Sequence, residues 1–197
     1  MRPKTLADLV GERPRRIGAR LMSWAQQGRI PSLLLYGPSG TGKTTLARLL
    51  AQEAQQFFEE LSGVHASVKD IHATAELAKT RLPRRTIVFL DEIHRFNRGQ
   101  QDSLLPYVES GVFTLIGATT ENPSFYLNSA LLSRLQVLRL EMHTDADLTL
   151  MLNRALTDRE YGLALHQAQV PAITSEALHL IAQLAQGDAR RKVAGGV

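Results

Sequence analysis

The stretch GPSGTGKTT at residues 37–45 constrains the fold of this chain more than any other part of the sequence. It matches the pattern G-x-x-x-x-G-K-[ST] and stands between an apolar run at 32–36 and a helical pattern that begins at residue 44. Glycines at this spacing let backbone N–H groups curl around a phosphate, and the start of a helix adds partial positive charge. A strand, this loop and a helix in succession predict a nucleotide-binding P-loop.

Two residues of the loop have separate expected roles. The Lys43 ammonium is expected to reach the β- and γ-phosphates of ATP, and the Thr44 hydroxyl to coordinate Mg²⁺. The alternative is a glycine-rich turn with a surface lysine. It does not explain why a strand pattern precedes the loop and a helical pattern follows it. The expected nucleotide ligands of the loop are Gly37, Pro38, Ser39, Gly40, Thr41, Gly42, Lys43, Thr44 and Thr45.

A second motif, TIVFLDE at 86–92, follows the P-loop by about fifty residues. An apolar strand that ends in an acid places Asp91 at the carboxyl edge of a parallel sheet, where α/β proteins bind their ligands. Asp91 is expected to hold the Mg²⁺ shell, and Glu92 to polarise a water against the γ-phosphate. A kinase would need a phosphate-acceptor site, so the pair favours hydrolysis.

The remaining pattern alternates between strands and helices, which predicts a doubly wound, five-stranded parallel sheet flanked by helices. From Thr144 onward only amphipathic helical patterns occur. We therefore expect an α/β nucleotide-binding domain over 1–142 and a partial, apparently incomplete helical lid over 143–197. Expected strands lie at 32–36, within 61–67, and at 86–90, 113–118 and 137–140; expected helices lie at 14–27, 44–60, 68–82, 100–111, 128–134, 145–158 and 175–188.

Composition excludes several classes of protein. The chain of 197 residues has no cysteine, and its six histidines show no HExxH spacing, so a protein-ligated zinc is not expected. No apolar run approaches the length of a membrane span, and the N-terminus lacks the apolar run of a secretory signal. We expect a cytoplasmic protein without a membrane partner. The net charge is +4, and short arginine clusters could track a phosphate backbone or form a solvated surface.

Four motifs in this order, GPSGTGKTT, FLDEIHRFNRGQQDSLLPYVESG, FTLIGATTENPSFYLNSALLSRL and GDARR, resemble the AAA+ ATPases of the clamp-loader clade. Within that clade the chain is similar to the replication-associated recombination protein A family, with the eukaryotic Werner-helicase-interacting protein as a relative. HRFN and ATTENPSF are far more specific than the nucleotide motifs. The resemblance covers nearly the whole chain but only the N-terminal part of the family's architecture.

The resemblance implies roles for matching positions. Thr120, with Thr119 as the neighbouring candidate, is similar to the sensor residue that reads the γ-phosphate. Arg134 is similar to the arginine finger that acts in trans on a neighbouring subunit, and Arg190 to the sensor-2 arginine of the lid. The strand before Thr120 should lie between the P-loop strand and the strand that ends at Asp91. Residues Arg2, Pro3 and Val10 are similar to the segment that cradles adenine.

The resemblance also implies a function. The implied function is that of a homo-oligomeric, DNA-stimulated ATPase motor for replication-fork maintenance, recombination and repair. The implied partners are forked, gapped or single-strand-containing DNA, single-stranded-DNA-binding protein and replisome components. A Holliday-junction branch-migration ATPase fits GATT but not HRFN or ENPSF, and a clamp-loader subunit lacks its zinc cysteines here. A scaffold subunit that does not hydrolyse ATP would be expected to have a broken P-loop or to lack Glu92. A truncated nucleotide-binding domain stays open, because KVAGGV replaces the family's usual continuation after GDARR.

Overall fold

The computed structural model describes residues 3–157 and 173–189, and these contain a five-stranded parallel sheet. The strand order is β2-β3-β4-β1-β5, so β4 lies between β1 and β3, as expected for the strand that leads to Thr120. The predicted α/β class is confirmed. The strands are β1 Leu33–Tyr36, β2 Phe57–Ser62, β3 Thr86–Asp91, β4 Thr114–Thr119 and β5 Gln136–Arg139.

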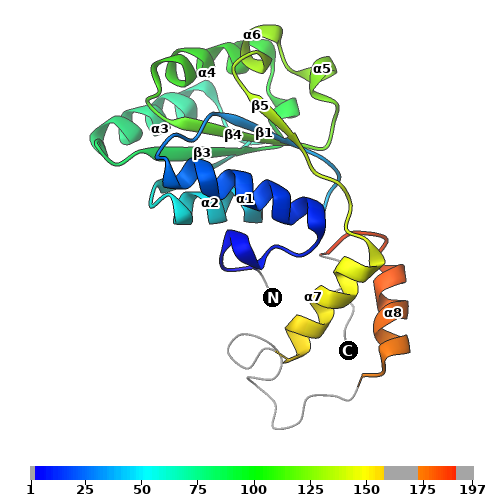
Figure 1. Cartoon of the computed structure of the whole chain (residues 1–197). Coiled ribbons are helices and arrows are strands. Elements are labelled where there is room, and N and C mark those ends of the chain that lie inside the picture. Colours follow the sequence, from blue (N-terminus) through cyan, green and yellow to red (C-terminus); the bar gives the residue numbers. More distant parts are fainter. Residues whose placement is uncertain (1–2, 158–172, 190–197) are drawn as a thin grey trace.

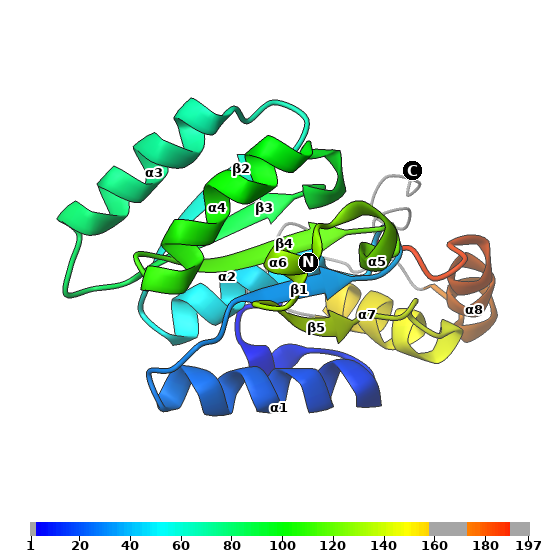
Figure 2. The same cartoon turned by 90° about the horizontal axis from the view of Figure 1, so that it is seen from above.

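Helices cover both faces of the sheet (Figures 1 and 2). Helices α1 and α2 lie on one face, and α3, α4, α5 and α6 lie on the other. This arrangement follows from right-handed crossovers between parallel strands. The helices are α1 Glu12–Gln26, α2 Lys43–Glu53, α3 Val68–Thr80, α4 Arg98–Ser110, α5 Pro123–Tyr126 and α6 Ser129–Leu132, with short 3₁₀ turns η1 Leu6–Asp8 and η2 Ile93–Arg95.

The central strands are apolar at consecutive positions because both of their faces are buried. Leu33 and Leu35 on β1 pack in the core beneath α1 and α2, whereas Leu34 between them packs in the core beneath α3 and α4. Phe89 and Leu90 on β3 divide between the same two cores. The two cores hold the ends of β1, β3 and β4 in fixed relative positions.

The prediction of one helix over 44–60 is wrong. Helix α2 ends at Glu53, Gln55 takes a left-handed conformation (φ 53°), and β2 starts at Phe57 and pairs in parallel with β3. Accordingly, the second strand lies at 57–62, earlier than the expected 61–67. Tertiary packing overrides helix propensity here, because Phe58 stacks on Phe89 with ring centroids 6.0 Å apart.

Beyond the sheet, α7 Asp145–Thr157 packs on α8 Ser175–Leu184 (Figure 1). Their shared core is small, with Leu148, Ala182 and Ala185 as its buried members. The N-cap of α8 is Thr174, whose hydroxyl accepts a hydrogen bond from the Ala177 N–H. No helix in the described ranges is long and apolar enough to cross a bilayer.

Candidate nucleotide-binding site

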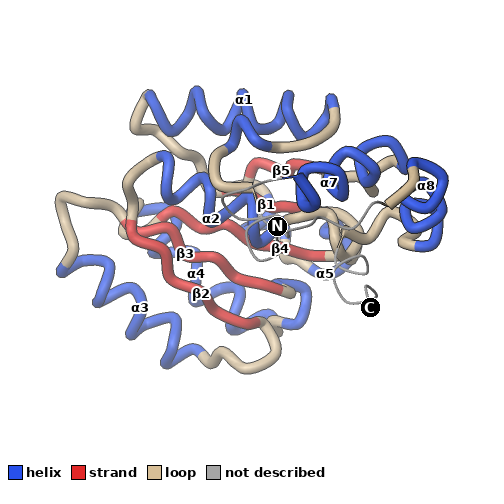
Figure 3. Tube along the Cα trace, turned by 90° about the horizontal axis from the view of Figure 1, so that it is seen from below, coloured by secondary structure: helices blue, strands red, loops and turns tan. Residues whose placement is uncertain are grey.

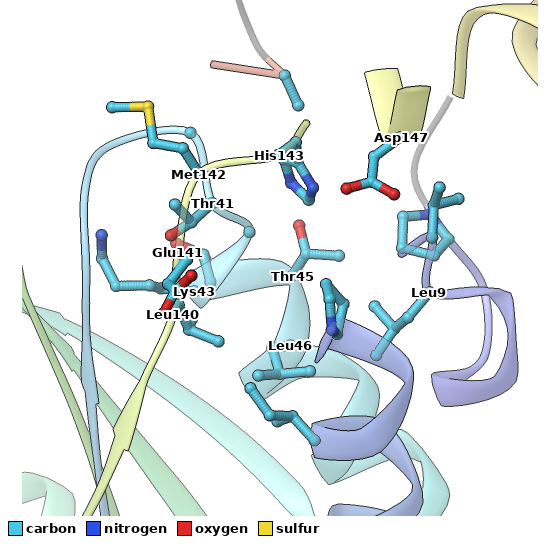
Figure 4. A pocket seen from close by; sticks show the side chains of 18 of the residues that line it. Leu9, Thr41, Lys43, Thr45, Leu46, Leu140, Glu141, Met142, His143 and Asp147 are labelled. Carbon is cyan, nitrogen blue, oxygen red and sulfur yellow. The ribbon is translucent and has the colours of Figure 1, made fainter. Parts of the chain in front are cut away.

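A cavity of about 1650 Å³ opens at the carboxyl edge of the sheet, between the sheet and α7. The P-loop, the segment after β5 and the N-terminal segment contribute to its wall (Figure 4). The ends of β3 and β4 contribute as well. The tube view in Figure 3 shows the same strands ending toward α7. Carboxyl edges of parallel strands are where α/β proteins bind their ligands. Predicted site residues in its lining are Pro3, Val10, Ser39, Gly40, Thr41, Gly42, Lys43, Thr44, Thr45, Asp91, Glu92 and Thr120.

The P-loop is shaped by two glycines in the left-handed conformation, Gly40 (φ +79°) and Gly42 (φ +87°). Residues with a side chain rarely adopt this conformation. Gly42 is the N-cap of α2, and Lys43 is its first residue. The Lys43 Nζ donates to the carbonyl oxygens of Gly37 and Pro38 at 2.6 and 2.8 Å. The loop thus forms a concave turn at the start of a helix, the arrangement that binds phosphate.

The acidic pair is held by an unusual backbone. Asp91 is the last residue of β3, and Glu92 follows it in a left-handed conformation (φ 51°) with its N–H bonded to Asp91 Oδ1 at 3.0 Å. Gly63 packs directly against this turn: its N–H donates to the Asp91 carbonyl at 2.7 Å, and a Cβ on Gly63 would lie 2.2 Å from the Glu92 carbonyl oxygen. Sequence reasoning missed Gly63, whose only signal was a glycine just after a strand.

The two sensor candidates differ in exposure. Thr119 is buried, and its hydroxyl contacts His94 Nδ1 at 3.0 Å and accepts from the Glu121 N–H at 3.0 Å. Thr120 is exposed, and both residues line the cavity. Thr119 therefore ties the end of β4 to η2, which directly follows Glu92, and leaves Thr120 as the side chain facing solvent.

Arg134 lies away from the cavity that the other residues share. It precedes β5 by two residues, which places it at the amino edge of the sheet, opposite the P-loop. Its guanidinium pairs with Glu109 near the end of α4 and donates to the Ala130 carbonyl at 2.6 Å. Arg134 is not in the cavity lining. Its role as a finger that acts in trans stays a prediction.

The opposite end of the cavity lies between the N-terminal segment and α7. The Arg154 guanidinium donates to the Asp8 carbonyl at 3.0 Å, linking α7 to η1. His143 and Asp147 point into the same space above Thr45 (Figure 4). Burial alone would raise the pKa of Asp8, but hydrogen bonds from Thr5 and Lys4 and the charge of Arg154 lower that pKa overall. Sequence reasoning did not find His143, Asp147 or Arg154, because no local motif marks them.

Several features bear on the expected ligands. Apolar side chains of Leu9, Val10 and Ile17 at one end suit a base, and the P-loop at the other end suits a triphosphate. Thr44 and Asp91 share the cavity, and their oxygens are donors that Mg²⁺ accepts. Within the described residues no group of three His, Cys, Asp or Glu is arranged to hold a metal ion. Arg2 and Arg190 lie outside the described residues.

Comparisons with known proteins agree with this geometry. Residues 33–141 match the family described as ATPase family associated with various cellular activities (AAA). The chain is 46% identical over 193 residues to Replication-associated recombination protein A of Coxiella burnetii, and 44% identical over 194 residues to the protein of that name in Escherichia coli K12. In both cases 97% of this chain and 43% of the relative are covered. It is also 42% identical to ATPase WRNIP1 of Dictyostelium discoideum, covering 96% of this chain and 22% of that protein.

Among solved structures, the chain resembles the RuvB Holliday junction branch migration motor of Thermotoga maritima, with a TM-score of 0.77 and 32% identity. The likeness covers 98% of this chain and 62% of the RuvB chain. This chain spans less than half the length of the curated relatives named above.

Proposed function

Because this chain belongs to the AAA family of ATPases, we propose that it is a Mg²⁺-dependent ATP hydrolase that works as a motor of DNA metabolism. The observation that carries the proposal is the convergence of Lys43, Asp91 and Glu92 on one cavity at the carboxyl edge of the sheet. A phosphate-binding lysine, a metal-binding acid and a second acid for the attacking water are the parts that hydrolysis of a γ-phosphate needs.

The residues have separate proposed tasks. The P-loop N–H groups and Lys43 bind the β- and γ-phosphates, while Thr44 and Asp91 hold Mg²⁺, which neutralises the developing charge when bound. Glu92 orients and polarises the attacking water as a general base. Thr120 contacts the γ-phosphate from the end of β4. Pro3, Val10 and the α7 side chains enclose the base, with Arg2 and Arg190 as further ligands.

We place Arg134 in the nucleotide site of a neighbouring copy. Its position at the edge opposite its own P-loop supports this, as does its planar, permanently charged guanidinium. Such a finger contributes roughly 10³–10⁵ in rate by stabilising transition-state charge. The proposal requires a homo-oligomer. It also divides the chain into an α/β domain, 1–142, and a helical lid, 143–197.

The proposed setting is the cytoplasmic maintenance of replication forks, recombination and repair. The names of the relatives support it, since two are replication-associated recombination proteins. Forked, gapped or single-strand-containing DNA would be the stimulating partner, together with single-stranded-DNA-binding protein and replisome components. A second candidate, branch migration of Holliday junctions, is favoured by the likeness to RuvB.

Steady-state phosphate release, measured with ATP and Mg²⁺ and with or without DNA, tests the proposal. We expect turnover that forked DNA stimulates and that both Lys43→Ala and Glu92→Gln abolish. Stimulation by four-way junctions, but not by forks, would support branch migration instead. Nucleotide binding without turnover under every condition would contradict the motor and leave a nucleotide-binding domain.

Subunit mixing tests the position of Arg134. In a full-length, assembly-competent protein, Lys43→Ala and Arg134→Ala are each expected to be inactive. Mixed oligomers should regain some turnover, because an intact site can then meet an intact finger. Formation of mixed oligomers without any recovery would show that Arg134 is not the finger.

A further inference from the structure

Glu92, the proposed general base, has a strained backbone conformation. Its φ of 51° lies in the left-handed region, which a residue with a side chain adopts only at a cost in energy. Such a conformation persists where the surrounding contacts hold it. Hydrogen bonds reach this turn from both strands that flank β3. On the β2 side the Gly63 N–H donates to the Asp91 carbonyl at 2.7 Å, and on the β4 side the contact is made by His94.

His94 lies two residues after Glu92, in the middle of η2. Its Nδ1 is 3.0 Å from the hydroxyl oxygen of Thr119, the last residue of β4. Its ring also packs edge-on against the Tyr126 ring, with 5.9 Å between the ring centroids. The imidazole is half-buried and does not line the nucleotide cavity. His94 is therefore placed to act through its neighbours and not on the nucleotide itself.

The Thr119 hydroxyl is a fixed anchor for this contact. Thr119 is buried, its strand pairs in parallel with β1, and its hydroxyl accepts from the Glu121 N–H at 3.0 Å. The hydroxyl proton has two acceptors within reach, and His94 Nδ1 at 3.0 Å is nearer than the Glu121 carbonyl oxygen at 3.3 Å. If Nδ1 carries the proton instead, it donates to the same hydroxyl oxygen. In either case one hydrogen bond joins the end of β4, which leads into Thr120, to the turn of Glu92.

We propose that His94 is a positioning residue for ATP hydrolysis, and that its hydrogen bond to Thr119 holds Glu92 in the conformation that reaches the attacking water. The proposal rests on the proposed ATPase function and adds a residue to it. Without this bond, η2 would relax and Glu92 would leave the strained conformation for part of the time. A displacement of about 1 Å between reacting groups can lower a rate by ~10²-fold. The bond also makes the general base and the proposed γ-phosphate contact of Thr120 move together.

Two variants separate the hydrogen bond from the ring packing. His94→Phe keeps an aromatic ring against Tyr126 but removes Nδ1. His94→Asn loses the ring but keeps a polar atom in the place of Nδ1, since the two atoms are the same number of bonds from Cα. In steady-state phosphate release by the full-length protein, we expect kcat to fall about tenfold in His94→Phe, as for the loss of one hydrogen bond, and to stay within about twofold of wild type in His94→Asn. The KM for ATP should be unchanged in both, because the nucleotide contacts are untouched.

The matched control is His72→Phe. The Nδ1 of His72 also bonds to a hydroxyl, that of Tyr107, and the His72 ring packs edge-on against the Tyr107 ring with 5.8 Å between the centroids. This pair joins α3 to α4 and not η2 to β4, so kcat should be unchanged.

A double-variant cycle tests whether Thr119 is the partner through which His94 acts. Thr119→Val removes the hydroxyl at nearly constant shape. Its kcat should fall at least as far as that of His94→Phe, because the bond from the Glu121 N–H is lost as well. The double variant should be no slower than Thr119→Val alone, because the second substitution finds the bond already absent.

Amide hydrogen exchange of the ligand-free chain tests the same bond without turnover. The N–H groups of Arg95 and Phe96 donate to the Glu92 and Ile93 carbonyls and close η2. Their exchange should be faster in His94→Phe than in wild type, and unchanged in His94→Asn. The exchange of the central strand β1 should be the same in all three proteins.

Four outcomes would overturn the proposal. These are a wild-type kcat in His94→Phe, a His94→Asn variant as slow as His94→Phe, multiplied losses in the double variant, and wild-type exchange of η2 in His94→Phe. The second outcome would assign the role of His94 to its ring packing on Tyr126. A chain that hydrolyses no ATP under any condition would refute the proposed function, and exchange at Arg95 and Phe96 would still decide whether His94 holds the turn of Glu92.

Discussion

The two ends of the nucleotide cavity are built in different ways. The phosphate end stands on the sheet, where two large cores fix the ends of β1, β3 and β4. The base end lies between η1 and α7. Among the described residues, the core between α7 and α8 has three buried members. A side-chain bond from Arg154 to the Asp8 carbonyl joins the two sides of that end.

This difference separates catalysis from affinity. Packing of the sheet holds the proposed reacting groups in place without a ligand, so we propose that the phosphate end is preorganised. We propose that the base end opens by local motion, since the α7–α8 core is much smaller than the two cores of the sheet among the described residues. Substitutions at the phosphate end should therefore change the turnover rate, and substitutions at the base end should change the affinity for nucleotide.

The largest effect that tests this difference between the two ends is expected from Glu92→Gln. The amide keeps the shape of the side chain but removes the general base, so we expect kcat to fall by roughly 10²–10⁴-fold. Nucleotide affinity, measured by titration calorimetry, should change little. The control is Glu121→Gln, an exposed acid in the loop after β4 that should leave kcat unaltered. A large loss of affinity in Glu92→Gln would show that the two ends are not separable.

Gly63→Ala tests whether the backbone holds the catalytic acid. The added Cβ would lie 2.2 Å from the Glu92 carbonyl oxygen and 2.9 Å from that of Asp91, so the turn must shift. We expect a loss of about 1–3 kcal/mol in the free energy of unfolding, together with reduced kcat. Gly99→Ala is the matched control, because its nearest atom is 3.5 Å away and alanine favours the helix. A normal kcat in Gly63→Ala would show that Gly63 is not needed to position Glu92.

Arg154→Ala tests the base end. Loss of the bond to the Asp8 carbonyl should cost about 0.5–1.5 kcal/mol, which appears as a several-fold weaker affinity for ATP. The value of kcat at saturating ATP should be unchanged. Thr149→Ala, on the same helix, alters a bond within α7 only, lies outside the cavity lining and serves as the control. A fall in kcat with unchanged affinity would reverse the division of roles between the two ends.

The smallest expected effect is the acid sensitivity of the base end. The pKa of Asp8 is lowered in the folded chain by hydrogen bonds from Thr5 and Lys4 that outweigh the opposing effect of burial. A group with a depressed pKa contributes stability above its unfolded pKa and loses it as the pH falls through the folded value. The difference in thermal unfolding between wild type and Asp8→Asn should therefore be full at pH 7 and begin to shrink as the pH falls below about 4. A difference that is constant with pH would exclude this linkage.

The sequence predicted which loop and which acidic pair meet at the carboxyl edge of the sheet, because these residues lie in local motifs, while their chemical roles stay predictions. In GPSGTGKTT and TIVFLDE, the motif and the strand before it lie in one continuous segment, so spacing alone implies geometry. The order of β4 between β1 and β3 was also predicted correctly, through the family resemblance. Five parallel strands were expected and found.

The errors and omissions lie where distant contacts decide. The helix expected over 44–60 stops at Glu53, because Phe58 gains more from packing on Phe89 than its segment gains as helix. Gly63 is defined by its approach to Glu92 across neighbouring strands, and Arg154 by its bond to Asp8, 146 residues away. No local pattern carries such information. The assignments of Thr120 and Arg134 stay predictions.

Strand β5 connects two features that were described separately. Arg134 stands just before its first residue, and Leu140 just after its last residue is so close to Gly37 that a Cβ there would lie 2.2 Å from the Leu140 carbonyl oxygen. The chain then continues through Met142 into α7 (Figure 2). A pull on Arg134 by a neighbour's phosphate would be transmitted along one short, hydrogen-bonded strand to the P-loop and the lid of this subunit. In the proposed homo-oligomer, β5 would act as a mechanical link through which each site responds to the nucleotide of its neighbour.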